Sequence, residues 1–86
     1  MQAANLLAEA TVLARQLDYQ IREEYLDGAG GGHCYFSGKK WLLLDITQSP
    51  EEQLHDVADA LRSEAGVWRL EVSPPLAQML QLTNAA

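Results

Sequence analysis

The chain has a single cysteine, Cys34, so no disulfide can form within it. A lone thiol is typical of reducing compartments, and we therefore expect a cytoplasmic location. The sequence also lacks a long apolar run, because the longest, residues 41–44, is far too short to span a bilayer. No basic segment followed by a long apolar stretch opens the sequence, so we expect neither a targeting signal nor a membrane partner.

Basic residues are scarce. Six Lys and Arg side chains stand against twelve Asp and Glu, which gives a formal net charge of −6. Proteins that bind nucleic acids need clustered basic residues to neutralise phosphates, and here only Lys39 and Lys40 are adjacent. We interpret that pair as a solvated hairpin tip. The acidic balance therefore argues against DNA, RNA and anionic membranes as partners.

The length of 86 residues predicts one domain, residues 1–86. A domain of this size buries only about 60–65% of its unfolded surface. Hydrophobic residues nonetheless make up 48% of the chain. Self-association is a plausible way to supplement so small a core, and we expect a homo-oligomer or another protein as partner.

Two long helices are predicted from apolar spacing. Residues 3–17 repeat Ala and Leu at steps of three and four, which places them on one helix face. A second helix begins at Ser49, which is suited to cap it, with Pro50 at the first position and Glu52 at the capping-box position. Gly66 is suited to a left-handed stop.

Strands are predicted where the period changes to two. Residues 19–25, 33–37 and 40–46 fit this pattern, and a tight turn at residues 37–39 joins the last two. Residues 67–72 alternate again and are predicted to form a short strand or an extended segment. A short helix follows from Ser73, with Leu76, Met79, Leu80 and Thr83 on one side, and residues 84–86 should fray. The predicted class is α+β: a three- to four-stranded, mostly antiparallel sheet, arranged as a meander, with two long helices on one face and a short C-terminal helix.

A glycine-rich loop separates the first two strands. Gly30, Gly31 and the adjacent His33 are candidate ligand-binding positions, because bare backbone can approach a ligand closely. The dinucleotide fingerprint would need a third glycine at residue 33 and a following helix, and both are absent. The alternative interpretation is a flexible connection between strands.

His55, Asp56 and Asp59 have the spacing of the zinc-protease helix motif His-Glu-x-x-His. In a metal site, His55 and Asp59 would be ligands, and Asp45 or His33 would complete the set. The alternative is a solvated His–Asp pair extended by Arg62, with Asp45 satisfying loop amides at a strand end. The catalytic set is incomplete, so we expect no metal, no cofactor and no catalytic residue.

Three further side chains are candidates for packing or chemistry. Cys34 is expected to be a small buried hydrophobe, and a nucleophilic role would need a nearby base. Trp41 and Trp68 are the largest apolar side chains and are expected to anchor the core or an interface.

Several of these residues together resemble a known group of proteins. Residues 30–32 with Cys34, then Gly38-Lys39, a strand ending in Asp45 and residues 52–54 opening a helix, are similar to small bacterial proteins to which no function is assigned. The resemblance covers residues 19–80, implies the helix–strand–hairpin–helix order and implies no activity.

The same order is similar, more distantly, to the core of zincin-type metallopeptidases. In that comparison His55 matches the first His, while Asp56 and Asp59 replace the Glu and the second His. The resemblance therefore implies a core without the full metal site.

The function predicted from the sequence is a non-enzymatic protein-interaction or scaffold module that self-associates. The observation behind it is the strand at residues 41–44, which is apolar on both faces and needs cover on both sides. The C-terminal helix is an alternative cover for the second face. Two other functions stay open: a zincin-like metal-dependent hydrolase using His55 and Asp59, and a small-molecule binder using the glycine loop.

Overall fold

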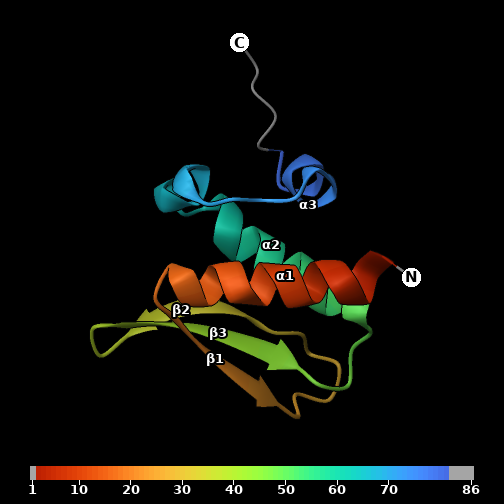
Figure 1. The fold of residues 1–86 in the computed structure, drawn as a ribbon. Coiled ribbons are helices and arrows are strands. Elements are labelled where there is room, and N and C mark those ends of the chain that lie inside the picture. Colours follow the sequence, from red (N-terminus) through yellow and green to blue (C-terminus); the bar gives the residue numbers. More distant parts are fainter. Residues whose placement is uncertain (1, 82–86) are drawn as a thin grey trace.

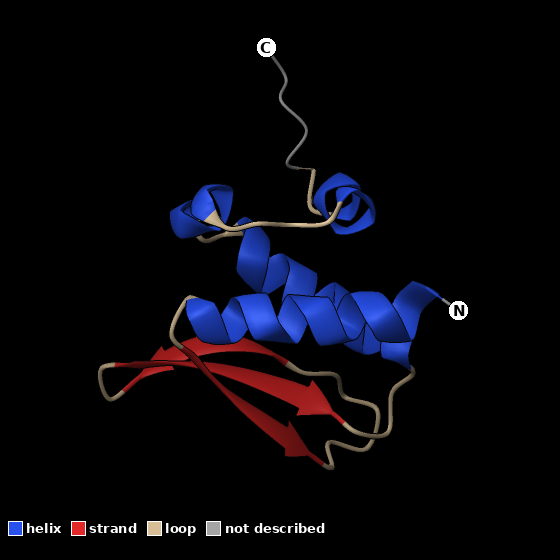
Figure 2. Ribbon diagram, in the orientation of Figure 1, coloured by secondary structure: helices blue, strands red, loops and turns tan. Residues whose placement is uncertain are grey.

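A computed structural model describes residues 2–81. The elements in chain order are α1 (Gln2–Gln16), β1 (Tyr19–Glu24), β2 (Gly32–Phe36), β3 (Lys39–Asp45), α2 (Pro50–Arg62), the 3₁₀ helix η1 (Ala65–Arg69) and α3 (Pro74–Met79). Figures 1 and 2 show three layers: the sheet, then α1 and α2 on one of its faces, then η1 and α3 beyond those helices. The predicted α+β class is confirmed, with two long helices on one face and a short C-terminal helix. None of the described helices is both long and apolar enough to cross a bilayer.

The sheet has the strand order β1-β3-β2, so the last strand in the chain is the central one. β2 and β3 form an antiparallel hairpin whose two turn residues, Ser37 and Gly38, both have positive φ, as the tight type I′ turn requires. β1 pairs with β3 in parallel. The expected antiparallel meander is therefore wrong in one of its two pairings. The reason is the glycine-rich connection, which is long enough to carry the chain past the end of β3 before β2 begins.

The core lies between the sheet and the two long helices. From β3, Leu42 and Leu44 point to this side and are buried. Alanines on both helices allow the helices to pack closely. The buried cluster consists of Ala10, Leu13, Ala14, Tyr19, Leu42, Leu44, Leu54, Val57, Ala58, Ala60, Leu61, Val67, Leu76 and Leu80. The predicted start of α2 is confirmed, because Ser49 and Glu52 form a complete capping box.

The segment after α2 differs from the prediction. Helix α2 ends at a C-cap on Ser63, so the predicted stop at Gly66 is wrong. Gly66 instead lies in η1, where a Cβ would come within 3.1 Å of the Leu17 side chain. Of the two alternatives for residues 67–72, the short strand is wrong, because the 3₁₀ helix η1 includes residues 67–69 and Val67 is buried in the core rather than paired in the sheet. The backbone is extended from Leu70. Thr83 and residues 84–86 lie outside the described residues.

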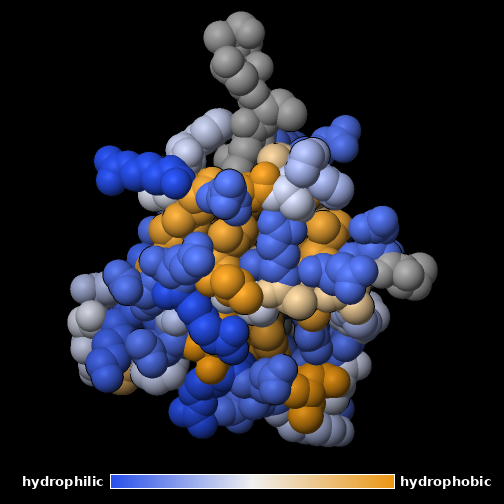
Figure 3. Space-filling model, viewed as in Figure 1, coloured by the Kyte–Doolittle hydropathy of each residue, from blue (hydrophilic) through white to orange (hydrophobic). Residues whose placement is uncertain are grey.

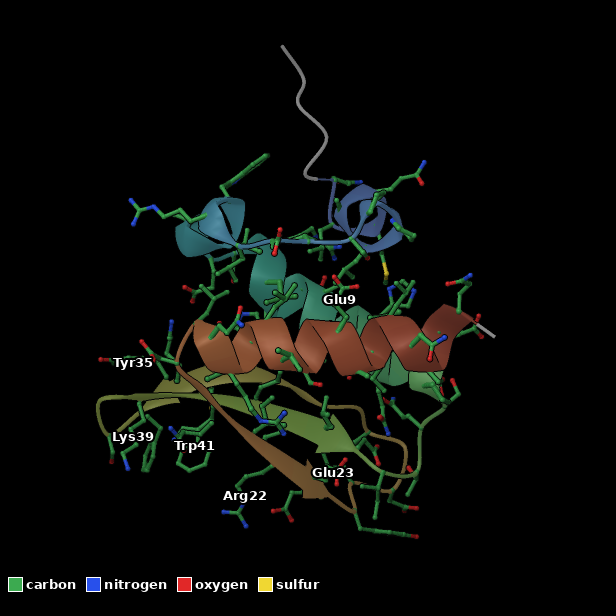
Figure 4. All side chains as sticks on the ribbon, viewed as in Figure 1. Glu9, Arg22, Glu23, Tyr35, Lys39 and Trp41 are labelled. Carbon is green, nitrogen blue, oxygen red and sulfur yellow. The ribbon has the colours of Figure 1, made fainter. Side chains whose placement is uncertain are left out.

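Helix α3 is held against α1. The Glu9 carboxylate accepts hydrogen bonds from the Ser73 amide at 2.8 Å and from the Ser73 hydroxyl at 2.6 Å. Figure 4 shows Glu9 pointing from α1 toward the C-terminal layer. Leu76 of α3 and the following Leu80 are also buried. Helix α3 therefore packs on the far side of the helices and does not cover the second face of the sheet, which was the alternative considered from the sequence.

Candidate functional site

The second face of the sheet is left without a covering element in the described part of the chain. We define this open face by the strand residues that point away from the helices: Gln20, Arg22 and Glu24 of β1, Cys34 and Phe36 of β2, and Lys39, Trp41 and Leu43 of β3. The register places Cys34 and Gln20 on either side of Trp41. Figure 4 shows Arg22, Lys39 and Trp41 on the side of the sheet opposite the helices.

The open face is apolar at its centre. A shallow hollow of about 470 Å³ is lined by Arg22, Glu24, Leu26, Cys34, Phe36, Trp41 and Leu43. Trp41 and Leu43 are half-buried, whereas Phe36 is 69% exposed. Cys34 is exposed, so the expectation of a buried cysteine is wrong. Its side chain points to the face that lacks a cover, and this explains the difference.

Charge on the open face differs from charge on the rest of the molecule. The strands contribute two basic side chains, Arg22 and Lys39, and the carboxylate of Glu24. Arg22 and Glu24 form an ion pair of 2.7 Å. The whole chain has a net charge of −6. The open face is thus a weakly charged, slightly basic area on an acidic protein.

One end of the sheet is closed by a buried carboxylate. Asp45 is fully buried and accepts hydrogen bonds from the amides of Leu26 (3.3 Å), Gly30 (3.1 Å) and Thr47 (3.0 Å) and from the Thr47 hydroxyl (2.7 Å). Burial acts to raise the pKa of Asp45, but these hydrogen bonds outweigh it and lower the pKa to about 2. Of the two sequence interpretations, the geometry fits a strand-end residue that satisfies loop amides.

The glycine loop is tied to the protein by carboxylates. The Gly30 amide donates to Asp45 and the Gly31 amide donates to Asp56 at 3.1 Å. A ligand bound by these two amides would therefore have to displace both carboxylates. His33 lies at the start of β2, with its ring edge-on to Tyr19 at a centroid distance of 6.4 Å. The three candidate ligand positions thus have partners within the chain.

The candidate metal ligands each interact with a different part of the protein. Asp59 is exposed and pairs with Arg62, which is one part of the expected His–Asp–Arg arrangement. His55 is exposed and lines a hollow between the starts of α1 and α2, together with Glu51 and Met79. Asp45 and Asp56 hold loop amides instead. Within residues 2–81 no three His, Cys, Asp or Glu side chains are arranged to hold a metal ion.

Zinc titration tests this arrangement directly. We expect no stoichiometric zinc binding, because Asp56 and Asp59 are engaged by Gly31 and Arg62 and no three potential ligands converge among residues 2–81. Calorimetric titration of zinc into chelator-treated protein is the measurement. Stoichiometric binding that His55→Ala abolishes and Cys34→Ser leaves intact would contradict this expectation and favour the hydrolase.

A polar cluster at the other end of the sheet was not anticipated from the sequence. The Tyr19 hydroxyl donates to Glu64 at 3.1 Å, Lys40 pairs with Glu64 at 3.2 Å, and the Lys40 ammonium lies 4.9 Å from the centre of the Tyr19 ring. Burial and then the hydrogen bond to Glu64 raise the pKa of Tyr19 to about 12. Lys40 is therefore not part of a solvated tip. The cluster connects β1, β3 and the N-cap residue of η1 across 45 residues of sequence, and no local pattern reveals such a contact.

Comparisons with known proteins were made for the whole chain. It matches no protein-family model, no curated protein and no solved structure. The fold and the open face are consequently the observations on which a functional proposal has to stand.

Proposed function

We propose that this chain is a non-enzymatic protein-interaction module that associates with a second copy of itself through the open face. The single observation that supports this proposal is the absence of a cover over Trp41 and Leu43 within residues 2–81, although both are large apolar side chains of the central strand. Clustered apolar surface of this kind is typical of interfaces.

Charge favours a second copy as the occupant. Two chains of net charge −6 repel each other through most of their surfaces. The open face is the area where this repulsion is weakest, because its carboxylate Glu24 is already paired with Arg22. In a two-fold contact, each copy presents the Arg22–Glu24 pair and Lys39 around an apolar centre. A two-fold dimer would also enlarge the core of a chain this small.

The two tryptophans provide a matched test. Trp41 lies on the open face, whereas Trp68 in η1 is 62% exposed on the far layer. Another apolar area lies near that layer, because Val12 is 50% exposed and Figure 3 shows hydrophobic residues between α1 and the C-terminal segments. The same Trp→Glu change at the two positions therefore separates an interface on the open face from one on this second area.

We expect sedimentation equilibrium at micromolar concentration to give a mass above that of the monomer. Trp41→Glu should weaken the association more than about tenfold, because a buried aromatic anchor is replaced by a charge, and Trp68→Glu should leave it unchanged. A strictly monomeric parent would sink the proposal. An equal effect of the two substitutions would place the interface elsewhere.

A fluorescence measurement reports on the open face itself. Trp68→Phe leaves Trp41 as the single tryptophan. We expect acrylamide quenching of Trp41 to fall as protein concentration rises, because association shields the indole from solvent. Quenching that does not depend on concentration, in a protein that still associates, would show that the copies meet through another surface.

A further inference from the structure

The outer edge of β2 is an unprotected strand edge. β2 lies at one side of the sheet and pairs with no described strand other than β3. Its side chains from His33 to Phe36 are all exposed, and Tyr35 and Phe36 are 72% and 69% exposed. Figure 4 shows Tyr35 near the β2–β3 turn, on the side of the sheet where the helices lie. An exposed edge offers free N–H and C=O groups to another strand.

The two edges of the sheet differ in how they are protected. Natural proteins guard exposed edges with charged side chains, proline or bulges. β1 carries three successive charged residues, Arg22, Glu23 and Glu24, whereas β2 carries no Lys, Arg, Asp, Glu or Pro. On a protein with a net charge of −6, an edge strand without charged residues adds no repulsion of its own when a second acidic copy approaches.

The direction of the backbone groups follows from the hairpin. In a two-residue hairpin the residues that flank the turn, here Phe36 and Lys39, form a hydrogen-bonded pair, and such pairs alternate along the ladder. Cys34 is therefore hydrogen-bonded to β3, and the N–H and C=O groups of His33 and Tyr35 point to the outer edge.

We propose that β2 pairs antiparallel with β2 of a second copy, in a register centred on Cys34. This register hydrogen-bonds His33 to Tyr35 of the other copy and Tyr35 to its His33, which uses all the outward groups of both residues. It also places the Phe36 ring over Gly32, which has no side chain to obstruct it. The segment Gly32–Phe36 is thus complementary to itself.

This contact is separate from the one proposed for the open face. The two-fold axis of an edge pairing runs perpendicular to the sheet, so both open faces lie on the same side of one continuous sheet. Each copy keeps its open face free for a further contact. The edge contact is made mainly by backbone N–H and C=O groups of His33 and Tyr35, whereas the face contact centres on the side chains of Trp41 and Leu43, so either contact can form without the other.

Disulfide formation between the Cys34 residues of two copies tests the proposed register. Cα atoms of a facing pair that is not hydrogen-bonded lie about 4.5 Å apart, within the range of about 4.4–6.8 Å that a disulfide spans. Copper–phenanthroline in air removes two electrons and two protons from two facing thiols and links them.

We expect the native protein to form disulfide dimers rapidly. Disulfide formation should be about tenfold slower in Tyr35→Pro, which removes an outward N–H, and in Tyr35→Lys, which charges the edge. Circular dichroism checks that both variants fold.

The other edge provides the control. Cys34→Ser combined with Glu23→Cys places the only thiol on β1, and we expect slow linkage there. Linkage of Cys34 that is no faster than in the Glu23→Cys control, or that neither folded Tyr35 variant slows, would overturn the proposal.

A further variant distinguishes edge from face. Cys34 points to the open face, so a face-to-face contact also brings two of these thiols near each other. His33 and Tyr35 point to the opposite side of β2. We expect His33→Cys with Tyr35→Cys, in a Cys34→Ser background, to form disulfide dimers through the edge. If Cys34 links and these two do not, the open-face dimer stands and the edge pairing is wrong.

Discussion

Gly31→Ala is expected to destabilise the protein by about 3 kcal/mol, at the upper end of the cost of overpacking. A Cβ at Gly31 would lie 1.9 Å from the carbonyl oxygen of Leu43 and 2.8 Å from its carbonyl carbon. Both atoms belong to the backbone of the central strand, so no side-chain rotation relieves the clash. The loop would have to withdraw, which also breaks the hydrogen bond from the Gly31 amide to Asp56.

The adjacent glycine is the matched control. A Cβ at Gly32 would meet no heavy atom within 4 Å. Gly32→Ala should therefore change the free energy of unfolding by no more than about 0.5 kcal/mol. Urea denaturation of the two variants beside the parent is the measurement. Equal midpoints for both variants would mean that the loop does not pack on β3 as described.

Asp45→Asn is expected to lower the denaturation midpoint strongly at neutral pH. The carboxylate accepts four hydrogen bonds, from three amides and one hydroxyl. An amide side chain accepts through its oxygen alone and directs its NH₂ group at a donor, which leaves buried groups unsatisfied. We expect an effect several times larger than that of Asp59→Asn, because Asp59 is exposed and its partner within residues 2–81 is Arg62.

The difference in urea midpoint between the parent and Asp45→Asn should also depend on pH. Hydrogen bonding lowers the pKa of folded Asp45 to about 2, against about 3.9 for an unfolded Asp. A lowered pKa contributes stability that is fully present above the unfolded value and is lost as pH falls through the folded value. The urea midpoints of parent and variant should therefore approach each other between about pH 4 and pH 2. A difference as large at pH 2 as at pH 7 would contradict the assigned role of the charge.

Local patterns predicted the parts of the fold that depend on neighbouring residues. The start of α2 follows from Ser49 and Glu52, and the β2–β3 hairpin follows from the turn at Gly38, because capping and turn geometry are set within a few residues. The parallel pairing of β1 with β3 was missed. It is fixed by contacts between distant segments, such as the hydrogen bond from Gly30 to Asp45.

The candidate site was predictable only in outline. The apolar run at residues 41–44 predicted a strand with two apolar faces, and the structure shows Leu42 and Leu44 on the covered side and Trp41 and Leu43 on the other. The exposure of Cys34 was missed because it depends on where α3 packs. That position is set by the contact of Glu9 with Ser73, 64 residues apart.

The strand order has a consequence for the order of events during synthesis. A ribosome releases β1 and β2 before β3, the strand with which both of them pair. Until β3 emerges, the nascent chain holds an amphipathic helix and two edge strands that cannot form the sheet. β2 can then close on β3 as a local hairpin within microseconds, whereas β1 has to reach β3 across the glycine loop. The slow step of folding should accordingly be the docking of β1, and mutations that stiffen or lengthen residues 25–31 should change the folding rate more than the unfolding rate.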